Sequence, residues 1–200
     1  MKRTLLIIAF TAVLVVPTGL LGTVATAASA SPPKLTAMLL NISQMPTGWS
    51  VEKPSGGKAT LGCYTDNLMP KGVKQTETAS VDFQGKGGFP AVGEKLGTFT
   101  NATTGYKEVV ANLAGCKHFS GTSGGEKVTG GTVEQMSFPH YGDASEAFVV
   151  IFTVSGVRFY QDLLYVRKGS IVMAFFEGNL RSVNVSQFQG FVKKAVAKLP

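Results

Sequence analysis

Four polar side chains in the C-terminal half of the chain alternate in a way that could place them on one surface. Arg158, Tyr160 and Asp162 are separated by single residues in one apolar run, and Glu177 lies in the next. In a β-strand, residues two apart point to the same face. Two carboxyl groups in one pocket can divide acid and base roles if their pKa values are separated. The same groups could instead orient a bound ligand.

A second candidate for chemistry is the segment 121–125, GTSGG, which fits the pattern G-x-S-x-G. A nucleophile elbow needs a strand before the serine, a helix after it, and then an acid and a histidine. Here a helix is expected before the segment and a strand after it, and His140 is the only later histidine. We therefore expect no enzymatic activity. The alternative is a secreted hydrolase that uses Ser123, or Asp162 with Glu177.

No metal or other cofactor is expected. The two histidines, His118 and His140, lack the spacing of metal ligands, and neither cysteine belongs to a C-x-x-C pair. Export into an oxidising compartment would instead pair Cys63 with Cys116 in a structural disulfide.

The N-terminus has the features of a secretory signal peptide. Lys2 and Arg3 precede an apolar run over 5–16, and small residues follow as far as Ala30. We expect export and cleavage near Ala30, so that residues 1–30 are the signal and residues 31–200 form one exported domain. The alternative is that the apolar run remains as an anchor.

The formal net charge of +7 constrains the partners. The lysines are scattered, and no basic run suggests a nucleic-acid-binding stripe. An exported basic protein is attracted to anionic envelope polymers and lipid headgroups, so peripheral contact with the membrane or envelope fits the charge. The expected partner is an envelope component or another small molecule, with a protein as the alternative.

The pattern of apolar residues predicts an α+β fold: an antiparallel twisted sheet with helices packed on one face. The strands are expected mostly in sequence, and residues 50–78 are expected to be irregular. Helices are predicted over 34–43, from Asn101 to Gly115, and after Asn184; strands are predicted over 79–84, 94–100, 128–138 and 146–154, with two more within 157–178.

Two tight turns in the segment 151–178 define two faces of this sheet. The turns are expected at Ser155-Gly156 and at Lys168-Gly169. The first face is almost entirely apolar and should lie under the helices; it comprises Phe148, Val150, Phe152, Val154, Val157, Phe159, Leu163, Tyr165, Val172, Ala174 and Phe176, interrupted by Gln161 and Arg167. The second face mixes polar and apolar residues: Val149, Ile151, Thr153, Arg158, Tyr160, Asp162, Leu164, Val166, Ile171, Met173, Phe175 and Glu177.

The second face has two interpretations. It could be covered in part by residues 50–78, with its charges in ordinary ion pairs. It could instead be an amphipathic binding surface. On that hypothesis Arg158 orients an anionic group, and Ile151 and Met173 form the floor. The candidate ligand-binding residues are Arg158, Tyr160, Asp162, Glu177, Ile151, Met173 and Phe175.

The order of these segments resembles the actinobacterial extracytoplasmic sensor-domain family, which includes PknH-like external domains of receptor kinases. A leader is followed by "MPTGW" at 45–49, "VGEKLGTFTNATTGYKEVVANLAGC" at 92–116, "YGDASEAFVVIF" at 141–152 and "LLYVRKGSIVMAFFEG" at 163–178. The resemblance implies an α+β sheet, a ligand-binding cleft and no catalysis. The chain departs from the receptor kinase in lacking a kinase domain and in having one expected disulfide where the kinase sensor has two. The PsbP-like lipoprotein fold is the alternative resemblance.

The leading hypothesis is therefore a non-catalytic exported domain, sensor-like, that holds a small amphipathic or anionic envelope ligand or a partner protein. The alternatives are a secreted hydrolase and an envelope structural or adhesion protein retained by its charge.

Overall fold

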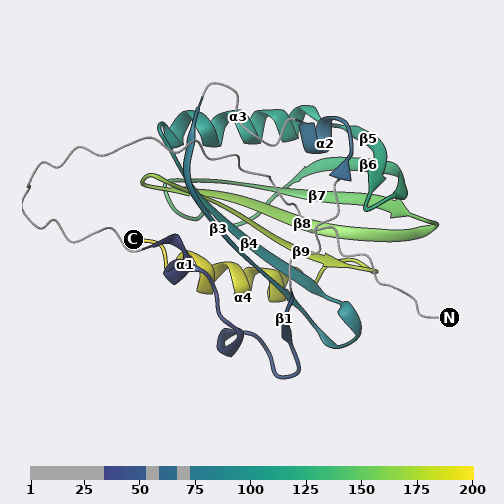
Figure 1. The fold of residues 1–200 in the computed structure, drawn as a ribbon, viewed down its shortest axis with the longest axis horizontal. Helices are drawn as coiled ribbons and strands as arrows, with labels where there is room; N and C mark the ends of the chain where they lie inside the picture. Colours follow the sequence, from purple (N-terminus) through teal and green to yellow (C-terminus); the bar gives the residue numbers. More distant parts are fainter. Residues whose placement is uncertain (1–33, 53–58, 67–72) are drawn as a thin grey trace, which may run out of the picture.

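The fold is a single open antiparallel sheet with helices packed against it (Figure 1). The structure is a computed structural model and describes residues 34–52, 59–66 and 73–200. The nine strands of the sheet lie in the order β1-β3-β4-β9-β8-β7-β6-β5-β2. The predicted α+β class is thus confirmed, while the predicted signal peptide lies outside the described residues.

The strands β7, β8 and β9 form the continuous meander expected near the C-terminus. Their bounds and those of the other strands are β1 Ser50–Glu52, β2 Ala59–Thr60, β3 Gln75–Gln84, β4 Ala91–Phe99, β5 His118–Ser123, β6 Glu126–Met136, β7 Ala144–Val154, β8 Val157–Lys168 and β9 Ile171–Asn179. The helices are α1 Leu35–Met38, α2 Cys63–Asp66, α3 Ala102–Gly115 and α4 Val185–Val196, with short 3-10 turns η1 Ile42–Gln44 and η2 Lys86–Gly88.

Helices cover both faces of the sheet, and not one face as the sequence suggested. In Figure 1, α3 lies on one side of the sheet and α4 with α1 on the other. The first face packs against α2 and α3, and the second face packs against α1 and α4. The reason is physical: Leu164, Met173 and Phe175 make the centre of the second face as apolar as the first, so it also needs cover.

Both long helices form where the sequence places a cap before an apolar stripe. The side chain of Asn101 accepts a hydrogen bond from the backbone N–H of Thr104, and Asn184 does the same for Gln187. The helix α3 then carries the chain from β4 to β5 across the first face. The helix α4 turns back from β9 onto the second face, where Phe188 and Phe191 are buried.

The polar residues that interrupt the first face have partners. Gln161 is buried, and its side-chain oxygen accepts a hydrogen bond from the hydroxyl of Tyr64 in α2, at 3.2 Å. Arg167 forms an ion pair with Asp143, at 2.9 Å. These contacts show how an apolar face accommodates two polar side chains.

The two C-terminal hairpins agree with the sequence in one case and differ in the other. Val154 pairs with Val157 across the turn Ser155-Gly156, as expected. The second turn was predicted at Lys168-Gly169, but Lys168 pairs with Ile171 and the turn residues are Gly169 and Ser170. Gly169 has φ +57°, which suits the first central position of a two-residue turn. The β8–β9 pairing is therefore two residues away from the prediction, and each residue keeps its face.

Three shorter segments also differ from expectation. The segment 121–125, expected between a helix and a strand, instead belongs to a hairpin between β5 and β6. The segment 50–78, expected to be irregular, contains two short strands, a short helix and the start of β3. The predicted helix over 34–43 is only α1 followed by η1, because Leu39 and Asn41 are extended.

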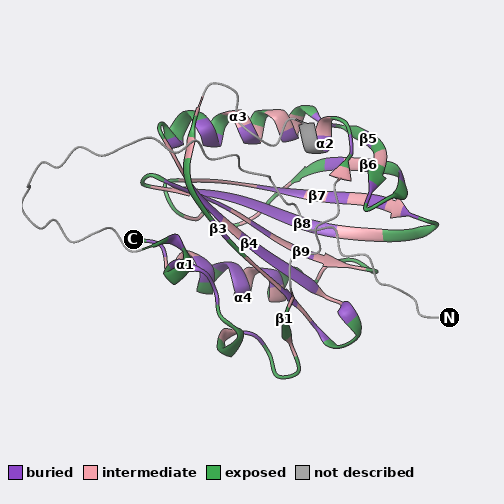
Figure 2. Cartoon of the chain, viewed as in Figure 1, coloured by how far each residue is buried: buried purple, intermediate pink, exposed green. Residues whose placement is uncertain are grey.

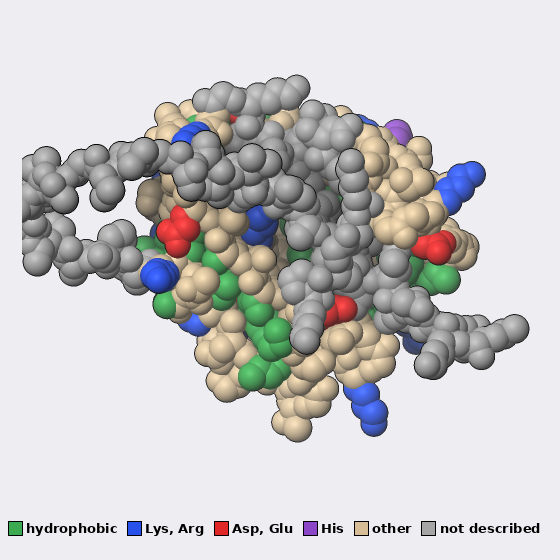
Figure 3. All heavy atoms as spheres, in the orientation of Figure 1, with side chains coloured by type: hydrophobic (Ala, Val, Ile, Leu, Met, Phe, Trp, Pro, Cys, Tyr) green, Lys and Arg blue, Asp and Glu red, His purple; other side chains and the backbone are tan. Residues whose placement is uncertain are grey.

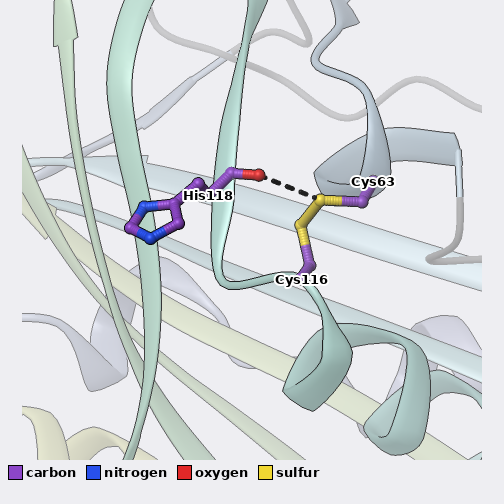
Figure 4. The surroundings of a disulfide bond; sticks show 3 residues. All are labelled: Cys63, Cys116 and His118. Atoms are coloured by element: carbon purple, nitrogen blue, oxygen red, sulfur yellow. Dashed lines mark hydrogen bonds between the residues drawn. A yellow bond between two sulfur atoms is a disulfide. The ribbon is translucent and has the colours of Figure 1, made fainter.

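The predicted disulfide joins Cys63 of α2 to Cys116, the C-cap of α3 (Figure 4). Its Cα atoms are 5.5 Å apart, and Cys63 Sγ lies 3.3 Å from the carbonyl oxygen of His118. The bridge fastens α2 to the end of α3 and the start of β5. Within the described residues, we find no helix that combines the length and apolar character needed to cross a membrane.

Candidate ligand-binding surface

The second face is divided into a half that α1 and α4 cover and a half that extends beyond them. In the covered half, Met173 and Phe175 are fully buried, and the ring of Phe175 lies 5.8 Å from that of Phe188 in α4. Figure 2 shows this buried central band of the sheet between helices whose outer sides are exposed. The expectation that Met173 and Phe175 lie on a surface away from the helices is therefore wrong. Both are core residues beneath α4.

The outer half of the second face carries the remaining candidates. Ile151 and Tyr160 lie opposite each other on β7 and β8 and are half-buried, while Arg158 is exposed. The guanidinium carbon of Arg158 is 5.4 Å from the centre of the Tyr160 ring, a cation–π contact. None of these three side chains belongs to the described apolar cluster under α4.

Asp162 and Glu177 lie side by side at the boundary between the two halves. The β8–β9 register places them directly opposite each other, with Val92 of β4 beyond Glu177 and Val149 of β7 beyond Asp162. Opposed side chains on one face have Cβ atoms about 5 Å apart. The sequence-based pairing had placed Tyr160 opposite Glu177. The observed register instead makes the two acids direct neighbours.

Both carboxyl groups are nearly inaccessible: the exposed fraction is 5% for Asp162 and 0% for Glu177. Neither carboxyl oxygen of Glu177 has a hydrogen-bond partner among the described residues. Burial raises the pKa of Glu177 to about 8, with a further contribution from the charge of Asp162. Burial raises the pKa of Asp162 to about 6. At neutral pH the pair therefore tends to retain a proton, mainly on Glu177.

Arg158 does not neutralise this pair. It lies four residues from Asp162 along β8, a separation of roughly 13 Å in an extended strand. Among the described residues the ion pair within 4 Å is that of Arg167 with Asp143, on the other face and at the other end of β8. In Figure 3, lysine and arginine side chains lie at separate points of the visible surface and not in one basic patch.

A third buried acid, Glu94 of β4, was not recognised in the sequence analysis. It lies opposite Phe175, and one of its oxygens accepts a hydrogen bond from the backbone N–H of Leu40, at 2.7 Å. Burial raises its pKa to about 7, while the bond to Leu40 and the charge of Lys198 act in the other direction. The available signal was its position: Glu94 alternates with Val92 and Leu96, both of which are buried.

The nucleophile elbow considered for Ser123 is not assembled in the structure. Ser123 is the last residue of strand β5, is 2% exposed and is followed by strand β6, whereas an elbow serine sits at an exposed turn between a strand and a helix. The described residues contain no group of three or more side chains suited to holding a metal ion. His140 lies in the loop before β7, and its Nδ1 is 3.5 Å from the hydroxyl of Ser145 in β7.

Comparisons with known proteins support the fold. No family model matches the chain, and no curated protein matches it. Among solved structures, the extracellular domain of PknH from Mycobacterium tuberculosis has a similar fold. Its TM-score is 0.53 at 11% sequence identity, and the match covers 80% of this chain and 93% of that one. At this identity the likeness shows a shared fold, so the resemblance stated from the sequence is confirmed at that level.

Proposed function

We propose that this chain is an extracytoplasmic, non-catalytic binding domain that holds a small amphipathic ligand on the outer half of its second face. The observation that carries the proposal is the fully buried carboxyl group of Glu177, which lies directly opposite Asp162 and has no hydrogen-bond partner in the part of the chain that the structure describes. Buried polar groups in folded proteins almost always have a partner. A ligand that reaches this position would supply one.

The surroundings of the pair suit an amphipathic ligand. The half-buried Val149 and Ile151 offer apolar surface on β7, and Tyr160 on β8 offers a ring with a polar end. Small-molecule sites combine mostly apolar walls with a few polar groups that fix orientation. Arg158 at the rim is free of ion pairs within the described chain and would meet a polar or anionic part of the ligand.

An extracytoplasmic location is supported by two features. The Cys63–Cys116 disulfide belongs to an oxidising compartment. The fold resembles that of an extracellular domain. The apolar leader expected from the sequence fits the same location, and so does retention at the envelope by the positive charge.

The test is recovery of ligand with the exported protein. Native mass spectrometry of protein purified from its exporting host, followed by extraction in organic solvent, would report bound small molecules. We expect bound ligand on the unaltered protein and at least a tenfold loss after Ile151→Asp, which places a charge on the apolar part of the surface. The control is Val157→Asp, an exposed apolar residue near the same hairpin but on the first face. Absence of ligand, or equal loss in both folded variants, would contradict the proposal.

A hydrolase remains the second candidate, since Asp162 and Glu177 are adjacent carboxyl groups whose pKa values differ. Screening against glycans, esters and peptides separates the two functions. Turnover that Asp162→Asn and Glu177→Gln both abolish would favour the enzyme, and turnover lost in Ser123→Ala would favour the serine hydrolase.

A further inference from the structure

The charges around Glu177 are all of one sign. Asp162 faces it from β8, and Glu94 lies diagonally from it on β4, next to Phe175. Lys198, which follows the end of α4, is engaged elsewhere: it donates a hydrogen bond to the carbonyl oxygen of Leu39 and lies near Glu94. On β4, Lys95 alternates with Glu94 and therefore belongs to the first face. No described cation faces the Asp162–Glu177 pair.

A partner for the ionised form of this pair must therefore donate hydrogen bonds and carry positive charge. A carboxylate accepts hydrogen bonds only, and a buried charge is stable only when it is paired. An anionic headgroup would add a third negative charge beside two acids. A metal ion would find only two side-chain ligands, and no larger group of metal-ligating residues exists in the described chain.

We propose that the Asp162–Glu177 pair binds the ammonium group of an amphipathic amine, whose apolar body lies along Ile151 and Tyr160. This inference rests on the proposed function and names the class of ligand. An ammonium group has three donors, enough to reach both carboxyl groups at once. Opposed side chains whose Cβ atoms are about 5 Å apart bring their carboxyl groups within reach of one such group.

Binding would be linked to protons in a defined direction. In the free protein the carboxyl group of Glu177 holds its proton at neutral pH, since its pKa is near 8. When a protonated amine binds, the O–H bond of that carboxyl group breaks and the proton passes to solvent, leaving a carboxylate that pairs with the ammonium. The charge of Asp162 acts directly on Glu177, while Lys198, just beyond the end of α4, acts on the diagonal neighbour Glu94. Affinity should therefore rise from pH 6 to pH 8.

The experiment compares three probes of equal length: octylamine, octan-1-ol and octanoate. Isothermal titration of the delipidated exported protein at pH 8 should give binding of octylamine at least about tenfold tighter than that of octanol, and weaker binding still of octanoate. Titrations in two buffers of different ionisation enthalpy should show release of protons on binding of the amine. Glu177→Gln and Asp162→Asn should each lower amine affinity about tenfold and leave octanol affinity unchanged. The control is Glu134→Gln, an exposed acid next along the same row, opposite Val149.

The outcomes separate this inference from the function on which it rests. Equal affinity for amine and alcohol, with loss of both in Ile151→Asp, would overturn the amine class and keep the binding surface. Amine binding that Glu177→Gln leaves intact would also overturn the inference. Binding of none of the probes by folded protein, together with no ligand recovered from the host, would overturn both.

Discussion

Glu177 of β9 and Asp162 of β8 are direct cross-strand neighbours on the second face of the sheet, and both side chains are buried. Two like-charged groups at this position oppose each other, and each resists ionisation because it is removed from water. No described cation compensates for them. Such an arrangement destabilises the free protein when both groups are ionised, which gives the first prediction.

Stability should fall as the pH rises from about 5 to 8. A carboxyl group whose pKa is higher in the folded state than in the unfolded state stabilises the fold below its unfolded pKa, and this contribution is lost as the pH rises through the folded pKa. For Glu177 that window runs from about 4.5 to about 8. Glu177→Gln should flatten the profile and be more stable than the unaltered protein at pH 8, by on the order of 2 kcal/mol.

Denaturant unfolding at several pH values measures this effect, with Glu134→Gln as the control because Glu134 is exposed on the same face. A profile that is flat between pH 5 and 8 in the unaltered protein would contradict the assignment of the buried pair.

Phe175→Ala should lower the stability of the fold strongly, whereas Arg158→Ala should hardly change it. Phe175 is fully buried against α4, so its truncation should lower the free energy of unfolding by about 3–5 kcal/mol. Arg158 is exposed, and its loss should change stability by less than about 0.5 kcal/mol. Thermal and denaturant unfolding of both variants would check this. Comparable stability of the two variants would mean that α4 does not cover Phe175.

Glu94→Ala should loosen the N-terminal segment 34–49. The carboxylate of Glu94 accepts a hydrogen bond from the backbone N–H of Leu40. Further along the same segment, Lys194 of α4 donates a hydrogen bond to the carbonyl oxygen of Gln44, at 2.7 Å. Removal of a buried acceptor leaves the N–H of Leu40 unpaired, at a cost of about 1–3 kcal/mol. Hydrogen exchange at Leu40 should accelerate in Glu94→Ala, while the exposed Lys193→Ala on α4 should leave it unchanged. Equal hydrogen-exchange protection of Leu40 in the unaltered protein, Glu94→Ala and Lys193→Ala would show that the Glu94–Leu40 contact does not hold this segment.

Reduction of the disulfide should destabilise the domain without changing the sheet. The bridge spans 53 residues, and chain entropy alone gives about 4 kcal/mol as an upper figure. The Cys63→Ser/Cys116→Ser double variant should melt at a lower temperature and keep its strand signal in circular dichroism. An unchanged melting temperature would contradict a structural role for the bridge.

Much of the fold could be predicted from local patterns. Alternation in β7 and β8 separated the two faces correctly, and Asn101 and Asn184 marked the starts of α3 and α4 because a side-chain acceptor before an apolar stripe is a local signal. The strand predicted over 128–138 is also present as β6, with a bulge at Gly130-Gly131 between Thr129 and Thr132 in the β6–β7 pairing.

What failed depended on contacts between distant parts of the chain. Whether α4 packs on the first or the second face cannot be read from its own stripe, since either face of the sheet offers apolar residues. The second turn was misplaced because Lys168-Gly169 and Gly169-Ser170 are both plausible turn pairs. The side chain of Asp143, from the loop before β7, accepts a hydrogen bond from the backbone N–H of Gly169 at 2.8 Å. This contact stabilises the observed Gly169-Ser170 turn. That single difference made Asp162 and Glu177 neighbours.

The most direct test of the central claim is the pKa of the Glu177 side chain, followed by carboxyl-carbon NMR in the exported protein labelled at glutamate. We expect a midpoint near 8 in the free protein, and a fall of at least one pH unit when octylamine is bound. Loss of the assigned resonance in Glu177→Gln identifies the signal. A midpoint near 4.5 in the delipidated protein would contradict the account, because Glu177 would then be a solvated or paired carboxylate with no need of a ligand.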